Sequence, residues 1–319
     1  MATMENPIIE LRGLTKCYGS IRAVDDLNLS IQKGEIFGLL GPNGAGKTTT
    51  ILMILGLTEP TSGSAYVCGY DATTTPILVK RKVGYMPDSL GFYDTMTALE
   101  NLMYIGELNG ISPYESKERA LSIMQVVGLE NDMNKKTSTY SRGMKQRLGL
   151  ADVLIKQPDV VILDEPTLGI DPSGVREFLG LIRQLSRQQG LTVLLSSHHL
   201  HHVQQVCDRV GIFVKGKLMA EGNMDTLSKN LFEEKSFEIR ITVMNNLTLP
   251  WEHEAEFLLL NSIKQAVVGD HEINVSCSKD VTPEIVRYFV DKGYDVMGVQ
   301  RKEYGLDDIY QKYFESSLN

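Results

Sequence analysis

The sequence contains no long uninterrupted hydrophobic run. Its apolar segments, such as VVILDEP and TVLLSSH, break at charged or polar residues, whereas a membrane-spanning helix needs about 20 mostly apolar residues. The first residues, MATMENPIIELRG, also lack the basic start and the apolar stretch of a secretory signal. We therefore expect a chain that does not cross a membrane and that remains in the cytoplasm.

An excess of positive charge is also missing. The 32 lysines and arginines are outnumbered by 40 aspartates and glutamates, which gives a formal net charge of -8. Nucleic-acid binding depends on a basic surface that attracts phosphates. Nucleic acid is therefore not an expected partner.

No CxxC pair occurs among the four cysteines, Cys17, Cys68, Cys207 and Cys277. Scattered cysteines favour free thiols in a reducing compartment over zinc sites or disulfides. Internal repeats, low-complexity stretches and long coiled coils are absent as well. The 319 residues, of which 42% are hydrophobic, therefore predict a globular chain with one large and one smaller domain.

The larger predicted domain covers residues 1–228 and has α/β character. In its opening third, short β-like runs end in EIFGLLG, which leads through a glycine loop into the helix-like KTTTILMILGL. Apolar residues at helical spacing predict a helical subdomain at about 97–157. Strand character returns in VVILDEP and TVLLSSH around a helix near Val175 to Gln189, which predicts a parallel sheet. A strand pair, VGIFVKG and KLMAEG, closes the domain.

A second domain, α+β in character, is predicted at 236–319. FEIRITV, AVVGDHEINVSC and VMGVQ are typical of strands, while TPEIVRYFVDKG and LDDIYQKYFE are typical of helices. The stretch from Lys229 to Lys235 is the expected linker between the two domains.

A phosphate-binding loop follows the strand EIFGLLG. The GxxxxGK[ST] pattern lets glycine residues turn backbone N–H groups toward phosphate oxygens, and the following helix adds its positive end. A chance glycine turn is the alternative, but the flanking strand and helix disfavour it. Lys47 is expected to reach the β and γ phosphates, and the Thr48 hydroxyl to be a Mg²⁺ ligand. The predicted nucleotide-binding residues are Gly41, Pro42, Asn43, Gly44, Ala45, Gly46, Lys47, Thr48 and Thr49.

Beside Lys47, which is also a catalytic candidate, three further site residues stand at the ends of predicted strands: the metal candidate Asp164 and the catalytic candidates Glu165 and His198. Asp164 follows VVIL, so its carboxylate should face the phosphate loop as a metal partner. Glu165 could accept a proton from the water that attacks the γ-phosphate, or orient that water. His198 ends the next apolar strand and could contact the γ-phosphate and hold that water in line. The alternative for the two carboxylates is a solvated strand terminus.

These ordered motifs resemble the ATPase subunits of ABC transporters, from the N-terminus to about Asp225. The segment YSRGM, residues 140–144, stands where that family has its LSGGQ signature. The resemblance implies a P-loop α/β ATPase with an antiparallel β subdomain, ATP and Mg²⁺ as ligands, and a second ATPase subunit. In that arrangement Ser141 and Gly143 contact the γ-phosphate bound to the opposite subunit. Arg142 and Met144 depart from the usual Gly and Gln.

Three more residues take roles from this resemblance. Asp88 follows GYMP where the family has the Q-loop glutamine, and an aspartate can still bind Mg²⁺ through oxygen. Asp171 lies in the D-loop segment LGID, where it would bridge the two sites, although an Asx turn before a proline is the alternative. Tyr18 stands where the family has its adenine-stacking aromatic residue, although packing is the usual role of such a tyrosine.

The histidine run at 198–202 allows another interpretation. His198 and His202 have the i,i+4 spacing of helical metal ligands. The resemblance assigns His198 to phosphate, however, and a solvated helix face explains His199, His201 and His202. A metal site there is therefore not expected.

The functional prediction is ATP hydrolysis that drives a separate integral membrane permease from the inner face of the membrane. The signature segment and the ending GLDDIYQKYF resemble ATPase subunits of bacterial exporters, so export is favoured over import. One rival is a soluble ABC-type ATPase of translation or DNA repair, which usually has two ATPase domains or long coiled-coil insertions. Another is a P-loop kinase or GTPase, which should lack the signature segment.

Overall fold

The structure of the chain is a computed structural model that describes residues 6–223, 226–227, 237–244 and 263–302. The chain divides near residue 224 into two compact units, and each is described by itself. The predicted linker, residues 229–235, and the predicted helix LDDIYQKYFE lie outside the described residues.

A six-stranded sheet in the order β10-β9-β3-β8-β7-β6 forms the centre of the first unit. Its first five strands in sequence order pair in parallel, and β10 pairs antiparallel with β9. Every residue of β3, β7 and β8 is buried, as their unbroken apolar runs predict for a sheet that is covered on both faces. The strands are β3 (Ile36–Leu40), β6 (Val83–Met86), β7 (Val160–Asp164), β8 (Thr192–Ser197), β9 (Arg209–Val214) and β10 (Lys217–Gly222).

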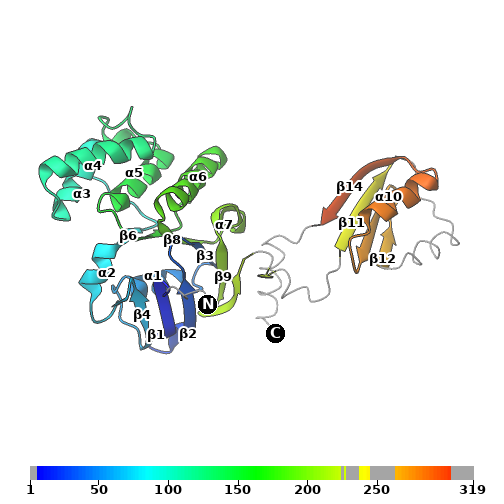
Figure 1. Cartoon of the computed structure of the whole chain (residues 1–319), viewed down its shortest axis with the longest axis horizontal. Coiled ribbons are helices and arrows are strands. Elements are labelled where there is room, and N and C mark those ends of the chain that lie inside the picture. Colours follow the sequence, from blue (N-terminus) through cyan, green and yellow to red (C-terminus); the bar gives the residue numbers. More distant parts are fainter. Residues whose placement is uncertain (1–5, 224–225, 228–236, 245–262, 303–319) are drawn as a thin grey trace. The chain divides into compact units, whose positions relative to one another are not determined.

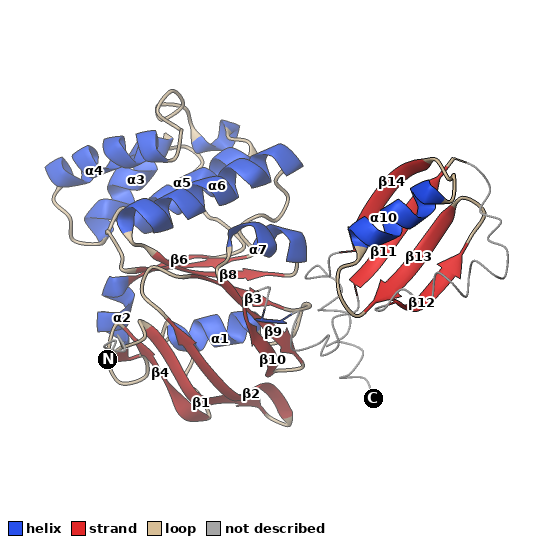
Figure 2. Cartoon of the chain, turned by 45° about the vertical axis from the view of Figure 1, so that its right-hand side comes forward, coloured by secondary structure: helices blue, strands red, loops and turns tan. Residues whose placement is uncertain are grey.

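An antiparallel sheet, β2-β1-β4-β5, lies against one side of this core. Helix α1 runs between the two sheets (Figure 2), and its Ile51 and Ile54 belong to one hydrophobic cluster with residues of both. The antiparallel β subdomain and the P-loop arrangement that the resemblance implies are therefore confirmed. The elements are β1 (Ile9–Tyr18), β2 (Ile21–Ile31), α1 (Lys47–Ile54), β4 (Ser62–Val67), β5 (Tyr70–Asp71) and α2 (Pro76–Lys82).

Helices cover the opposite side of the central sheet (Figure 2). Helix α3 begins where the sequence predicts, because Thr97 and Glu100 form a reciprocal capping box: Glu100 N–H donates to Thr97 Oγ1 at 3.2 Å and Thr97 N–H donates to Glu100 Oε2 at 2.7 Å. The helices of this part are α3 (Ala98–Leu108), α4 (Pro113–Val126), the short 3₁₀ helix η1 (Thr137–Thr139), α5 (Arg142–Leu154), α6 (Pro172–Gln189) and α7 (Leu200–Val206).

The second unit is a four-stranded antiparallel sheet in the order β12-β13-β11-β14, with α10 packed on one face. Ile285 and Phe289 of α10 are fully buried against the alternate strand residues that face them. The sequence predicts this α10 and the β-strand segments. The elements are β11 (Phe237–Val243), β12 (Ile263–Val268), β13 (Glu272–Cys277), α10 (Thr282–Asp291) and β14 (Val296–Lys302). Within the described residues, no helix combines the length and the apolar character needed to cross a membrane.

Candidate functional site

The glycine loop connects the end of β3 to the first residue of α1. Gly46 has φ 105°, and a Cβ placed on it would come within 2.4 Å of the Ala23 carbonyl oxygen. Gly44 has φ 80° and faces open space. Both positions need glycine because residues with a side chain rarely adopt this backbone conformation. The glycines of the GxxxxGK[ST] pattern are therefore required by the geometry of the loop.

Lys47 is buried inside the curve of this loop, with 6% of its surface exposed. Its Nζ donates to the Gly41 carbonyl oxygen at 2.7 Å and to the Pro42 carbonyl oxygen at 3.2 Å, and lies 3.6 Å from Glu165 Oε1. Burial lowers the pKa of Lys47, although Glu165 and Asp164 oppose that change. The desolvated ammonium is therefore not fully compensated by protein groups, which suits an anionic ligand such as phosphate.

Thr48 and Asp164 meet at the carboxyl end of β7. The Thr48 hydroxyl donates to Asp164 Oδ2 at 3.0 Å, and the Ser196 hydroxyl donates to Asp164 Oδ1. Asp164 and the nearby Asp88 also contribute, after burial itself, to raising the pKa of Tyr85 to about 12. Thr48, Asp164 and Asp88 thus place three oxygen donors of the kind Mg²⁺ prefers at one cavity.

That cavity measures about 230 Å³ and gathers most of the predicted site residues. Asp88, Asp164 and Glu165 reach it from the ends of two neighbouring strands, opposite the glycine loop. The lining residues are Ala23, Asn43, Gly44, Ala45, Gly46, Lys47, Thr48, Thr49, Asp88, Asp164 and Glu165.

Glu165 has a strained backbone and an unsatisfied oxygen. Its φ of 49° lies in the left-handed region, which is uncommon for a residue other than glycine. Oε2 lies 2.9 Å from His198 Nδ1, whereas the buried Oε1 has no hydrogen-bond partner among the described residues. Native structures rarely leave a buried carboxylate oxygen in this state, so Oε1 is suited to a hydrogen bond from a ligand or a water.

Four predicted residues lie elsewhere in the chain. Ser141 caps α5, where its hydroxyl accepts from Met144 N–H at 3.3 Å, and Gly143 follows on the same helix. Asp171 caps α6 by accepting from Ser173 and Gly174 N–H, each at 3.2 Å, which is the Asx-turn geometry. Tyr18 ends β1 half exposed, with Lys16 Nζ 5.1 Å from its ring centroid. The structure of one chain does not bring these four to the cavity.

Ser196 and Ala23 are site residues that sequence reasoning missed. Ser196 also accepts from Glu165 N–H at 3.2 Å, and it pairs directly with Asp164 across β7 and β8. The SS dipeptide before His198 was a usable signal, but only the order of the strands puts it beside Asp164.

Three rings of the histidine run lie close together, with tilts of 39° between His198 and His199 and 49° between His199 and His202. The ring centroids of His198 and His199 are 4.0 Å apart, and those of His199 and His202 are 5.0 Å apart. His202 Nδ1 lies 3.1 Å from Thr167 Oγ1, and His201 Nε2 lies 2.8 Å from Gln205 Nε2. In the described part of the chain, no three His, Cys, Asp or Glu side chains are grouped to hold a metal ion.

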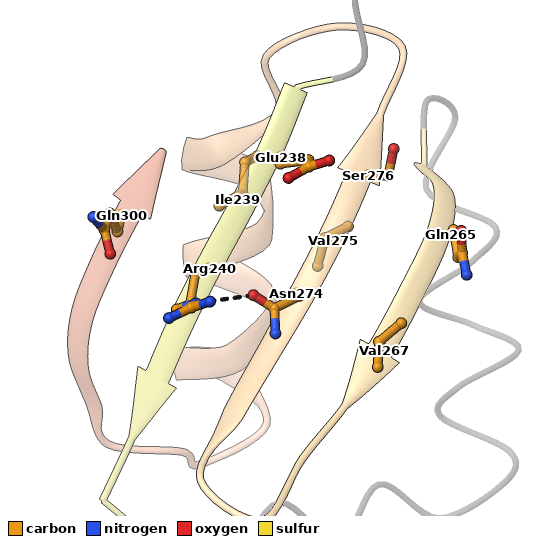
Figure 3. A pocket seen from close by; sticks show the side chains of 9 residues that line it. All are labelled: Glu238, Ile239, Arg240, Gln265, Val267, Asn274, Val275, Ser276 and Gln300. Atoms are coloured by element: carbon orange, nitrogen blue, oxygen red, sulfur yellow. Dashed lines mark hydrogen bonds between the residues drawn. The ribbon is translucent and has the colours of Figure 1, made fainter. Parts of the chain in front are cut away.

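A separate hollow of about 520 Å³ lies on the sheet of the second unit, on the face away from α10 (Figure 3). Arg240 Nε donates to Asn274 Oδ1 at 3.0 Å across β11 and β13. None of the predicted site residues is among its lining residues, which are Glu238, Ile239, Arg240, Gln265, Val267, Asn274, Val275, Ser276 and Gln300.

Comparisons with known proteins agree with the geometry of the first unit. Residues 24–168 match the family described as ABC transporter. The chain is 36% identical over 305 residues to the bacitracin transport ATP-binding protein of Bacillus licheniformis, covering 96% of both chains. It is 38% identical to the linearmycin resistance ATP-binding protein of Bacillus subtilis, covering 76% of this chain and 78% of that one.

Solved structures show the same fold. One neighbour is a dimeric ATP-binding cassette in a post-hydrolysis state with ADP and Pi, with a TM-score of 0.62, 27% identity and coverage of 68% of this chain and 98% of that one. Another is cbiO1 from Clostridium perfringens, part of the ABC transporter complex cbiONQ, with a TM-score of 0.64, 28% identity and coverage of 72% and 92%. The chain belongs to the ABC transporter family, as an ATP-binding subunit with ATPase activity.

Proposed function

We propose that this subunit hydrolyses Mg²⁺-bound ATP at a site completed by a second copy, and that it thereby drives export through a separate membrane permease. The observation that carries the proposal is the division of the predicted residues. Lys47, Thr48, Asp164 and Glu165 share one cavity, whereas Ser141 and Gly143 lie outside it. A site built from two chains accounts for both groups.

The phosphate side of the reaction is assigned to the loop and to β7. Lys47 and the N–H groups around Gly44 would bind the phosphate oxygens, and Thr48, Asp164 and Asp88 would hold the metal. Bound Mg²⁺ neutralises the charge that develops on the phosphates. Asp88 is shorter than the glutamine usual in the family, so its contribution is the weakest of the three.

The attacking water is assigned to Glu165. Its Oε2 is held by His198, and its Oε1, which lies 3.6 Å from Lys47 Nζ and has no hydrogen bond in the described structure, can accept one from that water. A carboxylate in that position can take the water's proton as the γ-phosphate leaves. His198 orients this carboxylate and contacts the γ-phosphate.

The second copy supplies the remaining contacts. Ser141 and Gly143 at the start of α5 would present hydroxyl and N–H donors to the partner's γ-phosphate. Asp171 would bridge the two sites, and Tyr18 would stack on adenine in its own subunit. A dimeric cassette among the structural neighbours supports this arrangement.

Export and the permease rest on the relatives. Two of them are named for bacitracin transport and linearmycin resistance, and a structural neighbour is part of a transporter complex. We infer that this chain binds a permease at the cytoplasmic face of the membrane and exports compounds of a similar kind. Affinity purification from membranes tests this: a multispanning protein should co-purify, and its absence would refute the transporter assignment.

Glu165→Gln tests the chemistry. The variant is expected to bind ATP and form ATP-dependent dimers while losing nearly all hydrolysis, because the amide keeps the shape but cannot accept the proton. Size-exclusion chromatography with ATP and a phosphate-release assay measure the two properties. Unchanged turnover would reject Glu165 as the base.

A further inference from the structure

Two segments that follow neighbouring strands contact each other at two points. The first segment, residues 165–168, follows β7, and the second, residues 198–202, follows β8 and enters α7. Glu165 Oε2 lies 2.9 Å from His198 Nδ1. Two residues further on, Thr167 Oγ1 lies 3.1 Å from His202 Nδ1. The loop that carries Glu165 is thus attached to α7 as well as to His198.

Neighbouring tilted rings connect the two contacts. The His199 ring neighbours both the His198 and the His202 ring, with centroid distances of 4.0 and 5.0 Å. The path from Glu165 through His198, His199 and His202 to Thr167 is therefore continuous. His201 takes no part in it and bonds Gln205 on its own helix.

The conformation of Glu165 needs such support. A positive φ at a residue other than glycine costs free energy and persists only where the surroundings hold it. Thr167 is 4% exposed, and its side-chain hydroxyl has His202 as its partner in the structure. Removing that partner would leave a buried hydroxyl unsatisfied next to the strained residue.

The direction of the pKa shift of His202 agrees with this contact. Burial, followed by the neighbouring histidines, lowers the pKa of His202, and burial likewise lowers that of His199. A neutral His202 ring can accept a hydrogen bond from the Thr167 hydroxyl at Nδ1.

We propose that His202 is a positioning residue for hydrolysis: by bonding Thr167 it fixes the loop that holds Glu165, and through its contact with the His199 ring it supports His198. This inference rests on the proposed role of Glu165. The positioning role of His202 differs from the two roles considered for it from the sequence, which are a metal ligand and part of a solvated helix face.

Steady-state kinetics of the full-length chain test the proposal. His202→Ala and Thr167→Val are each expected to lower kcat for ATP about tenfold, with KM and the affinity for ATP changed less than about twofold, because neither residue lines the nucleotide cavity. The double variant should be no slower than the slower single variant, because both substitutions remove the same contact. Thr167→Ser and His202→Asn, which keep a polar atom near the same place, should recover much of the activity.

His201→Ala on the same helix is the matched control and should keep wild-type kcat. Three results would overturn the proposal. The first is a wild-type kcat in His202→Ala, and the second is an equal loss of kcat in His201→Ala. The third is a double variant whose fold-loss of kcat equals the product of the two single losses. If His202→Ala does not fold, Thr167→Val and His202→Asn answer the same question. The outcome is separable from that of the proposed function: if Glu165→Gln is inactive while these variants are fully active, only the positioning role fails.

Discussion

Lys47 is the residue on which the phosphate site depends most. Its ammonium is buried, and the backbone carbonyls that bind it belong to the loop itself. Replacement by Met keeps the packing and removes the charge, so hydrolysis should fall about a hundredfold or more, the size expected when a charge-stabilising contact is lost. A phosphate-release assay measures this. Lys33→Met, at an exposed lysine, should hydrolyse ATP at the wild-type rate. A similar loss of hydrolysis in Lys33→Met would show that the effect is not specific to Lys47.

Asp152 of α5 predicts a pH effect on stability. Burial raises its pKa from 3.8 to about 6, although Lys156 opposes the rise. In the unfolded chain the Asp152 carboxyl ionises at the lower pKa. The folded state therefore loses stability as the pH rises from 3.8 to about 6. The loss is at most about 3 kcal/mol. Asp152→Asn should therefore stabilise the protein at pH 8 and have little effect at pH 4.

Chemical denaturation at the two pH values measures the difference between variant and wild type. Asp94→Asn serves as the control, because the Asp94 side chain is 67% exposed. A variant at Asp152 that is equally stable relative to wild type at both pH values would contradict the buried-charge explanation.

Residue patterns in the sequence predict the part of the site that lies within one chain. Lys47, Thr48, Asp164 and Glu165 follow from strand-end and glycine-loop chemistry, and the structure places them together. Ser196 could not be found in this way, because a serine inside an apolar strand gains meaning only when β7 is known to be its neighbour. The roles of Tyr18, Ser141, Gly143 and Asp171 depend on a partner chain, so they remain predictions.

At the scale of elements, helix caps decide where the helical subdomain begins. The capping box of Thr97 satisfies two N–H groups at the start of α3. Thr97→Ala should lower the free energy of unfolding by about 1 kcal/mol without changing the affinity for ATP. Urea denaturation measures this, with Thr73→Ala at an exposed turn as the control. An equal loss in the control would mean that the cap contributes nothing specific.

The sequence located elements better than it located their ends. The predicted helix near Val175 begins at Pro172, because Asp171 caps it and Pro172 occupies the first turn. Apolar periodicity starts only at Val175, so the polar first turn was missed. The order of the strands in the central sheet was also beyond reach, since neighbouring strands come from distant parts of the sequence.

At the scale of the whole molecule, we propose an ATPase domain at 1–228, with its helical subdomain at 97–157, and an accessory domain at 236–319. The two units hold separate hydrophobic clusters, one around the antiparallel sheet and α1 and the other around α10. Separate cores predict separate unfolding transitions. The accessory core is small, so one large side chain contributes a large share of its stability.

Phe289→Ala tests this division. Phe289 is fully buried in the accessory core, and its truncation should cost about 3 to 5 kcal/mol. Calorimetry should show that the unfolding transition of the accessory domain is weakened or lost. The unfolding transition of the ATPase domain and its ATP hydrolysis should persist. Val290→Ala on the same helix removes a side chain that is 56% exposed and should change neither transition. If Phe289→Ala lowers both transitions together, the two cores unfold as one unit and the proposed domain boundary is wrong.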